Sequence, residues 1–441
     1  MGLYLFFYYH TVIGLAPFAI FLATGINTVW GAFNDPLIGY LTDKNFKWTR
    51  KWGRRFPWMV MGLIPWCFII ILIFSSPDAT VNPWPAFIWL LTTLLLNELF
   101  ITLSDVHGNM LRADKFRTEF ERRKYSGYFG IFDMIAVVLG TAIPPLLIFG
   151  AGKEYYTIMA AIIAVIALVC AIIFLLFGAR EDKIMIDRYY SSNYEHLKFL
   201  KGTIGVLKQK SFMGFWFSAA GFGIANTMMT AMVAYVTTFV LQVPEEIMTL
   251  LFALFITGGM ISVPIWLKIL KKVNDTRKLY LIGSVIFCIA LIPLTFFVSL
   301  YDLAIFMFIA GFAIGCVWTL QIPVLFSHVQ DDFVVRTGRN QKGILIGAWA
   351  VLGLFTAFID ELLFAIVFTI TGFKEGFPTY ALLEAEVGVN AMIPIVWGIK
   401  FLIGVIPMII MALGTVAFWK LYPLTQDKVS ENKAKLKDIG F

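Results

Sequence analysis

Twelve apolar runs define this sequence, and all but the first are about 20–30 residues long. An α-helix needs about 20 apolar residues to cross the roughly 30 Å hydrocarbon core of a bilayer. Apolar residues make up 59% of the chain and charged residues 14%, against about 45–50% and 25% in a soluble domain. A water-soluble core cannot hide so much apolar surface, so we predict an all-α membrane protein. The runs lie at residues 1–15, 16–43, 55–75, 84–107, 124–149, 155–179, 211–241, 246–269, 278–299, 302–327, 342–371 and 390–420.

Basic residues concentrate in every second connection between these runs. Those connections hold 32 of the 35 Lys and Arg residues, and the connections between them hold only Lys153 and Lys374. Positively charged connections face the cytoplasm in membrane proteins. We therefore expect a multi-pass protein of the cell membrane with a cytoplasmic C-terminus. The lipid bilayer then surrounds the protein. Its net charge of +7 comes from these connections and does not imply binding to nucleic acid.

The runs fall into two sets of six, as in carriers built from repeated halves. We predict an N-terminal helix bundle at 1–179, a cytoplasmic central loop at 180–210, a C-terminal helix bundle at 211–420 and a cytoplasmic tail at 421–441. The first run ends in a turn at residues 14–17, and the residues before it reach only about 21 Å as a helix. We expect this first span to be truncated at its N-terminus.

Three stretches of the chain carry a resemblance to a known family. They are residues 34–39 leading into residues 52–58, Asp105 in the fourth run, and residues 318–321 followed by residues 332–339. On these motifs the sequence resembles the glycoside–pentoside–hexuronide:cation symporter group of the major facilitator superfamily, which is melibiose permease-like and includes sodium-dependent lysophosphatidylcholine symporters. The resemblance implies the major facilitator fold of two six-helix bundles, alternating access, and uptake driven by a sodium or proton gradient.

Ionisable residues at membrane depth are costly, so they mark a pathway or a paired site. Thr102 and Asp105 follow Glu98 at helical spacing, which places the three on one helix face. Oxygen ligands of this kind suit an alkali cation, and two close carboxylates can equally share a proton. The resemblance maps the cation site of the family onto Asn34, Asp35, Thr102 and Asp105. Glycine replaces a further family acid at position 31, so the coupling ion is left open between sodium and a proton.

The candidate solute site is aromatic. Trp318 and Gln321 share a helix face, where an indole can stack on a sugar ring or an acyl chain and an amide can bond a hydroxyl. Tyr8 follows similar logic, and the fifth run offers Tyr128 and Asp133. An aromatic packed in the core is the alternative interpretation for Trp318.

Charged residues beside the predicted cytoplasmic ends suggest an inner gate built from ion pairs between the halves. In the first half, Arg54 and Arg55 follow the second run. In the second half, two acids and two cations follow the tenth run. Ordinary solvated loop charge is the alternative, because surface pairs contribute little. The acids are Asp331 and Asp332, and the cations are Arg336 and Arg339.

Lys400 is the one basic residue far from a connection. It lies about 15 Å into the twelfth run, at nearly the depth that Asp360 and Glu361 reach in the eleventh. An unpaired charge at that depth costs a few kcal/mol. We therefore expect an intramembrane ion pair of structural character between Lys400 and one of the two acids. Binding of an anionic substrate group by Lys400 is the alternative.

These residues together predict a secondary active transporter that couples a cation, sodium or proton, to symport of a sugar or glycoside-like solute. Two family features for sugar are missing: the first-span acid would lie upstream of Met1, and the family arginine falls near Phe129. A lysolipid or amphiphile carrier is therefore one alternative, and a non-transporting receptor or scaffold is another. No enzyme, cofactor or metal motif occurs in the sequence, and we expect a monomer.

Overall fold

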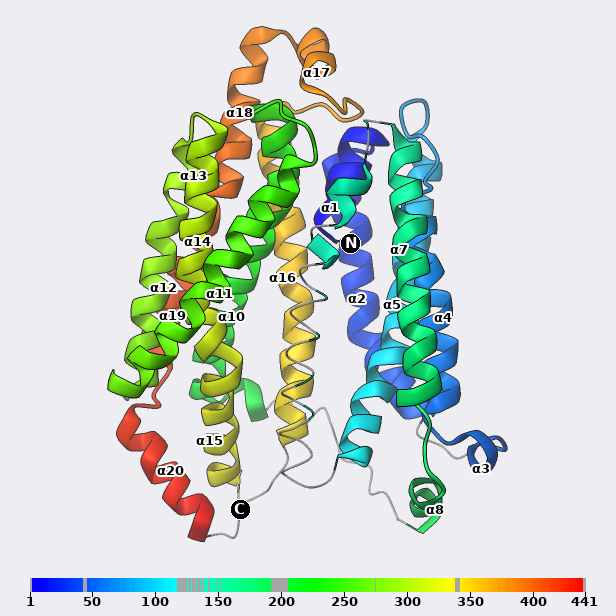
Figure 1. The fold of residues 1–441 in the computed structure, drawn as a ribbon, viewed down its shortest axis with the longest axis vertical. Coiled ribbons are helices and arrows are strands. Elements are labelled where there is room, and N and C mark those ends of the chain that lie inside the picture. Colours follow the sequence, from blue (N-terminus) through cyan, green and yellow to red (C-terminus); the bar gives the residue numbers. More distant parts are fainter. Residues whose placement is uncertain are drawn as a thin grey trace. The chain divides into compact units, whose positions relative to one another are not determined.

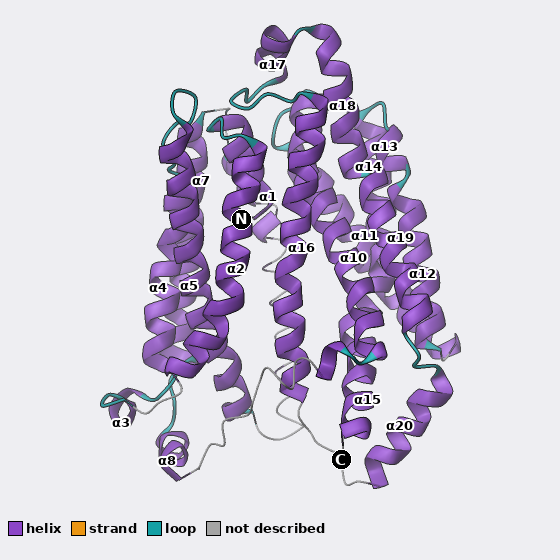
Figure 2. Cartoon of the chain, turned by 180° about the vertical axis from the view of Figure 1, so that it is seen from behind, coloured by secondary structure: helices purple, strands orange, loops and turns teal. Residues whose placement is uncertain are grey.

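The computed structural model describes residues 2–42, 46–116, 152–191, 205–273, 275–337 and 342–438, with separate positions between 125 and 150. Its elements are helices, and the described residues contain no strand (Figures 1 and 2). Eight of the described helices or helix pairs are long and apolar enough to cross a membrane. The prediction of an all-α membrane protein is therefore confirmed. Half of the fifth run, 124–149, lies outside the described residues.

The chain divides into two compact units. Unit 1 comprises Met1–His196 with Lys374–Glu386, and unit 2 comprises Leu197–Phe373 with Val387–Phe441. The segment 374–386 therefore belongs with unit 1 although it comes late in the sequence. The backbone amide of Gly376 links this segment to unit 1, because it donates to the carbonyl oxygen of His10 at 2.9 Å.

In unit 1, α4 packs against α5 and α7, and α5 also packs against α2 (Figure 1). Asn82 starts α5, because its side-chain oxygen accepts from the amide of Trp84 at 3.1 Å. Pro83 follows at the first helical position, where its missing N–H costs nothing. The elements are α1 (Gly2–Phe7), a π-helical turn (Tyr8–Val12), α2 (Pro17–Thr42), α3 (Thr49–Trp52), α4 (Phe56–Ile73), α5 (Pro83–Lys115), α7 (Lys153–Ile173), a second π-helical turn (Phe174–Gly178), α8 (Lys183–Ser191) and α17 (Tyr380–Val387).

In unit 2, α10 packs against α19, and α11 against α14, with α12 touching both α14 and α19 (Figure 2). The elements are α10 (Lys210–Tyr235), a π-helical turn (Val236–Val240), α11 (Ile247–Val273), α12 (Thr276–Leu291), α13 (Pro293–Phe296), α14 (Leu300–Leu320), a π-helical turn (Gln321–Phe326), α15 (Ser327–Thr337), α16 (Lys342–Thr371), α18 (Val389–Ile403), α19 (Val405–Leu421) and α20 (Gln426–Asp438).

The twelfth predicted run is not one continuous helix. It breaks at Gly404 into α18 and α19. A Cβ added to Gly404 would overlap the hydroxyl of Thr295 and lie 2.8 Å from its amide nitrogen. The helix therefore breaks at a position where the backbone of Thr295 lies too close for any residue other than glycine.

Glycines let α11 and α14 approach each other closely. Gly311 and Gly315 are four residues apart on α14, and they face Gly258 and Gly259 of α11. A Cβ on Gly311 would overlap the carbonyl oxygen of Phe255. Small residues at this spacing allow helix backbones to pack without intervening side chains in a bilayer.

We expect Gly311→Ala to destabilise unit 2 by about 1–3 kcal/mol, the usual cost of overpacking a well-packed contact. The new methyl group meets backbone atoms, so no side-chain rotation can relieve the overlap. Gly223→Ala on α10 is the control, because nothing lies within 4 Å of its added Cβ. Thermal unfolding of both purified variants measures the difference. Equal midpoints for Gly311→Ala and wild type would contradict the close approach.

Candidate functional site

A direct hydrogen bond joins α2 and α5 at the predicted cation site. The amide nitrogen Nδ2 of Asn34 donates to the hydroxyl oxygen of Thr102 at 2.9 Å. It also reaches the carbonyl oxygen of Glu98 at 3.4 Å. Both Asn34 and Thr102 are buried, at 1% and 2% exposure. Two of the four residues predicted for the cation site therefore touch, and they hold the two helices at a fixed level.

Acidic residues flank this bond. Asp105 follows Thr102 by three residues on α5, and its side chain is exposed in unit 1. Glu98 precedes Thr102 by four residues and is partly buried. Asp35 follows Asn34 on α2, but its side chain lies outside the described residues. Hydroxyl, amide and carboxylate oxygens at one level can ligate a hard cation or hold a proton.

Tyr8, predicted to meet the solute, lies in the packed interior of unit 1. Its side chain is fully buried, and its hydroxyl donates to the carbonyl oxygen of Phe74 at 3.1 Å. Its ring also packs on Tyr156, with the centroids 5.0 Å apart. In this structure Tyr8 ties the first helix to the end of α4, which is a packing role.

Gln321 belongs to a buried polar network inside unit 2. Its Nε2 donates to the hydroxyl of Tyr280 at 3.0 Å, and that hydroxyl shares a hydrogen bond with Ser218 at 2.9 Å. The network joins the segment after α14 to α12 and α10. All three side chains are buried. The side-chain amide of Gln321 is therefore already hydrogen-bonded within unit 2. Sequence spacing alone did not indicate this contact.

Trp318 packs edge-on against Phe255 of α11, with the ring centroids 6.1 Å apart. The absence of a side chain at Gly259 makes room for the indole. The residue is only partly buried, so these contacts do not cover all of its surface. Of the two residues predicted in the fifth run, Tyr128 is 57% exposed and Asp133 lies outside the described residues.

Arg54 and Arg55 of the predicted gate are buried within unit 1. The connection turns sharply at Gly53, whose φ is +88°. Glu181 then starts α4, because its carboxylate accepts from the amides of Arg55 and Phe56 at 2.8 and 3.1 Å. No sequence pattern pointed to Glu181, because it lies in the predicted central loop, more than 120 residues from its partners.

Asp332, another predicted gate residue, is a hub within unit 2. Its carboxylate accepts from Ser211 at 2.6 Å and from Gln209 Nε2 at 2.9 Å. It also pairs with Nε of Arg336 at 2.9 Å and receives Asn432 Nδ2 at 3.4 Å. These contacts fasten α15 to the start of α10 and to α20. Pairing across the halves, which also involves Asp331, stays a prediction, and Arg339 lies outside the described residues.

In this structure Lys400 contacts Phe297 rather than the acids predicted to pair with it. Its Nζ donates to the carbonyl oxygen of Phe297 at 2.8 Å and lies 4.7 Å from the centroid of that ring. The described side chains contain no ion pair between Lys400 and Asp360 or Glu361, and Asp360 Oδ1 and Glu361 Oε2 are buried without a hydrogen-bond partner. α13 ends at Phe296, so the next carbonyl lacks a helical partner and the lysine supplies one.

We expect Lys400→Ala to lower stability by about 1.5 kcal/mol, the low end for a hydrogen bond from a charged group. Because Lys400 and Asp360 share no partner, the effects of Lys400→Ala and Asp360→Ala should add in the double variant. Thermal unfolding of the two single variants and the double variant measures this additivity. A double variant more stable than the sum of the two single effects would support an ion pair between Lys400 and Asp360.

Comparison with known proteins identifies the fold family. The profile described as MFS/sugar transport protein matches residues 1–426. The chain belongs to the major facilitator superfamily. It is 24% identical to sodium-dependent lysophosphatidylcholine symporter 1 of Mus musculus, covering 100% of this chain and 85% of the relative. The inner membrane symporter YicJ of Escherichia coli strain K12 is 27% identical over 24% of this chain and 23% of its own length.

The nucleoside transporter NupG shares the fold, with a TM-score of 0.59 and 13% identity over 96% of each chain. The resemblance stated from the sequence motifs is therefore confirmed, and so is the major facilitator fold. As a member of this superfamily, the protein is a multi-pass membrane transporter. Its relatives are transporters rather than enzymes.

Proposed function

We propose that this protein is a secondary symporter that couples a cation, sodium or proton, to the movement of a solute by alternating access. The bond between Asn34 and Thr102 carries the proposal. It fixes, at one level of two packed helices, the stretches that bear Asp35 and Asp105. A cation or proton held there neutralises acids that are costly at membrane depth.

For the solute, we propose a lysolipid or similar amphiphile. Two relatives that match the whole chain are named sodium-dependent lysophosphatidylcholine symporter 1. Sugar recognition relies on several convergent polar groups, whereas the described candidates Tyr8 and Gln321 use theirs inside the units. A sugar or glycoside is the second candidate, favoured by the family description.

The test is uptake by purified protein in vesicles oriented as in the cell. Labelled lysophosphatidylcholine and a labelled glycoside are offered with an inward sodium gradient, an inward proton gradient, or neither. We expect accumulation of the lysolipid with one of the two gradients. Glycoside accumulation alone would select the second candidate. Binding of either solute without flux under any gradient would overturn transport and indicate a receptor.

A further inference from the structure

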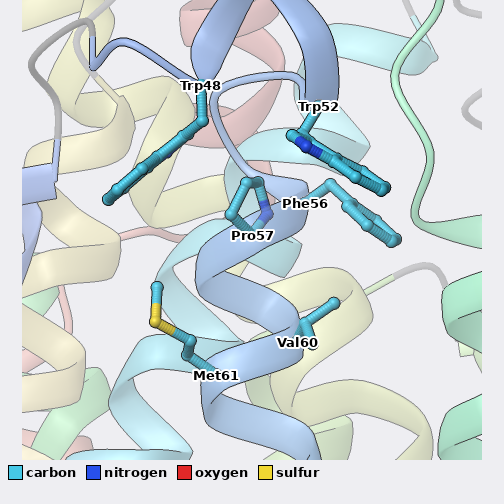
Figure 3. Close-up of a pocket in the computed structure, with 6 residues that line it drawn as sticks. All are labelled: Trp48, Trp52, Phe56, Pro57, Val60 and Met61. Atoms are coloured by element: carbon cyan, nitrogen blue, oxygen red, sulfur yellow. The ribbon is translucent and has the colours of Figure 1, made fainter.

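An apolar groove lies on unit 1 where the chain enters α4. The groove is open, with a volume of about 390 Å³. In Figure 3, Trp48 and Met61 line one side and Trp52, Phe56 and Val60 line the other, with Pro57 between them. The turn at Gly53 folds the short helix α3 back over the first turn of α4, which brings the two tryptophans to the groove.

The lining side chains are ordered among themselves and yet open to the surroundings. Trp52 stacks on Phe56 at 6.2 Å between centroids and 8° between planes. Trp48 stacks in the same way on Phe46, at 5.0 Å and 11°. Trp52 nevertheless remains 50% exposed, and Met61 remains 42% exposed. This surface therefore offers preformed aromatic walls with no partner of this chain seated between them among the described residues.

The groove continues along an exposed apolar face of α4. Phe68 and Leu72 follow Met61 by seven and eleven residues, which is the spacing of one helix face. They are 47% and 40% exposed. In a membrane-spanning helix such a face contacts acyl chains. An acyl chain that lies along α4 would reach the groove at the N-terminal end of this helix.

Cations border the groove. Nζ of Lys51 lies 5.6 Å from the Trp52 ring centroid, and the Arg180 guanidinium lies 5.9 Å from that of Phe56. Both residues are exposed, as is Lys47. Arg180 precedes α8, which lies at the same end of unit 1 as α3 (Figures 1 and 2). Two acids, Glu181 and Asp182, follow Arg180 and offset part of this positive charge. Glu181 is turned to the start of α4, where it accepts two backbone amides, and Asp182 is exposed.

We infer that this groove is a binding site for an anionic phospholipid of the cytoplasmic leaflet. The phosphate lies between Lys51 and Arg180, and one acyl chain begins between the tryptophans and runs along α4 toward Phe68 and Leu72. Tryptophan is enriched at the membrane interface, and basic residues beside it attract anionic headgroups. The site is separate from the coupling residues on α2 and α5, so it goes beyond the proposed transport function.

The first test measures lipid retention by native mass spectrometry of the purified full chain. Phosphatidylglycerol and phosphatidylcholine with identical chains are titrated separately. We expect phosphatidylglycerol to bind more tightly, and Lys51→Gln with Arg180→Gln to weaken it by about 25-fold, from about five-fold for each cation near a lipid surface. Lys271→Gln with Lys272→Gln is the control, because it removes two cations from the end of α11. Equal loss in the control would reduce the effect to general surface charge and overturn the site.

The second test locates the acyl chain. Phosphatidylglycerol with a photoreactive group in one chain is activated in membranes, and the adducts are mapped by peptide sequencing. We expect adducts on the segment 48–61, and their loss in the Trp48→Ala, Trp52→Ala double variant. Binding of inorganic phosphate alone, with no dependence on the tryptophans, would indicate a simple anion site. Adducts spread evenly over the exposed helices would overturn the groove. Asp105→Asn should leave both results unchanged.

Discussion

Asparagine in place of Asp105, or of Asp35, is expected to abolish cation-driven accumulation of the solute while exchange across the membrane survives. Each substitution removes a charge from the level fixed by the bond between Asn34 and Thr102. A hydrogen bond or contact to a charged group is worth about 1.5–3 kcal/mol. The cation affinity should therefore fall roughly 10- to 100-fold, which uncouples the gradient from the solute.

Two variants make this expectation specific. Asn34→Ala keeps every charge but removes the bond that holds α2 to α5, so it should weaken cation dependence less than the acid variants do. Asp78→Asn alters an exposed acid whose partner is Thr80 in the connection after α4, and it should leave uptake intact. The measurement is uptake against cation concentration in vesicles. Full gradient-driven uptake in both Asp35→Asn and Asp105→Asn would place the coupling site elsewhere.

The helices were largely predictable because lipid leaves the backbone few choices. A bilayer supplies no hydrogen-bond partners, so a long apolar run must become a helix. The runs at 55–75 and 84–107 accordingly match α4 (Phe56–Ile73) and α5 (Pro83–Lys115). The break at Gly404 was not predictable, because it depends on the approach of Thr295, more than 100 residues earlier.

The candidate sites divide in the same way. Helical spacing predicts that Thr102 and Asp105 share one face of α5. The structure adds the contact of Thr102 with Asn34, and the cation site itself stays a prediction. The contact of Lys400 with Phe297 was not predictable, because depth in the membrane says nothing about competing partners. The carbonyl of Phe297 is left open only because α13 ends there, and no pattern in the sequence reveals such a terminus.

Alanine in place of Asp332 is expected to destabilise unit 2 by about 3 kcal/mol. The carboxylate is 1% exposed and accepts from Ser211 and Gln209, which are buried as well. Removing it leaves these donors without their acceptor, and an unsatisfied buried group costs about 1–3 kcal/mol. The Arg336 partner adds little, because its side chain is half exposed and its charge is screened by water. Thermal unfolding followed by tryptophan fluorescence measures the loss.

The same variant should also release α20. Asn432 of that helix is 2% exposed and reaches Asp332 at 3.4 Å, and α20 packs on α15 beside it. Limited trypsin digestion should then cut after Lys433 or Lys435 faster than in the wild type. Glu431→Gln is the matched control, because it breaks only exposed pairs with Lys428 and Lys435 on α20 itself. If Asp332→Ala unfolds at the wild-type temperature and α20 stays protected, the carboxylate does not brace unit 2. The acid would then be free to pair across the halves, as a gate requires.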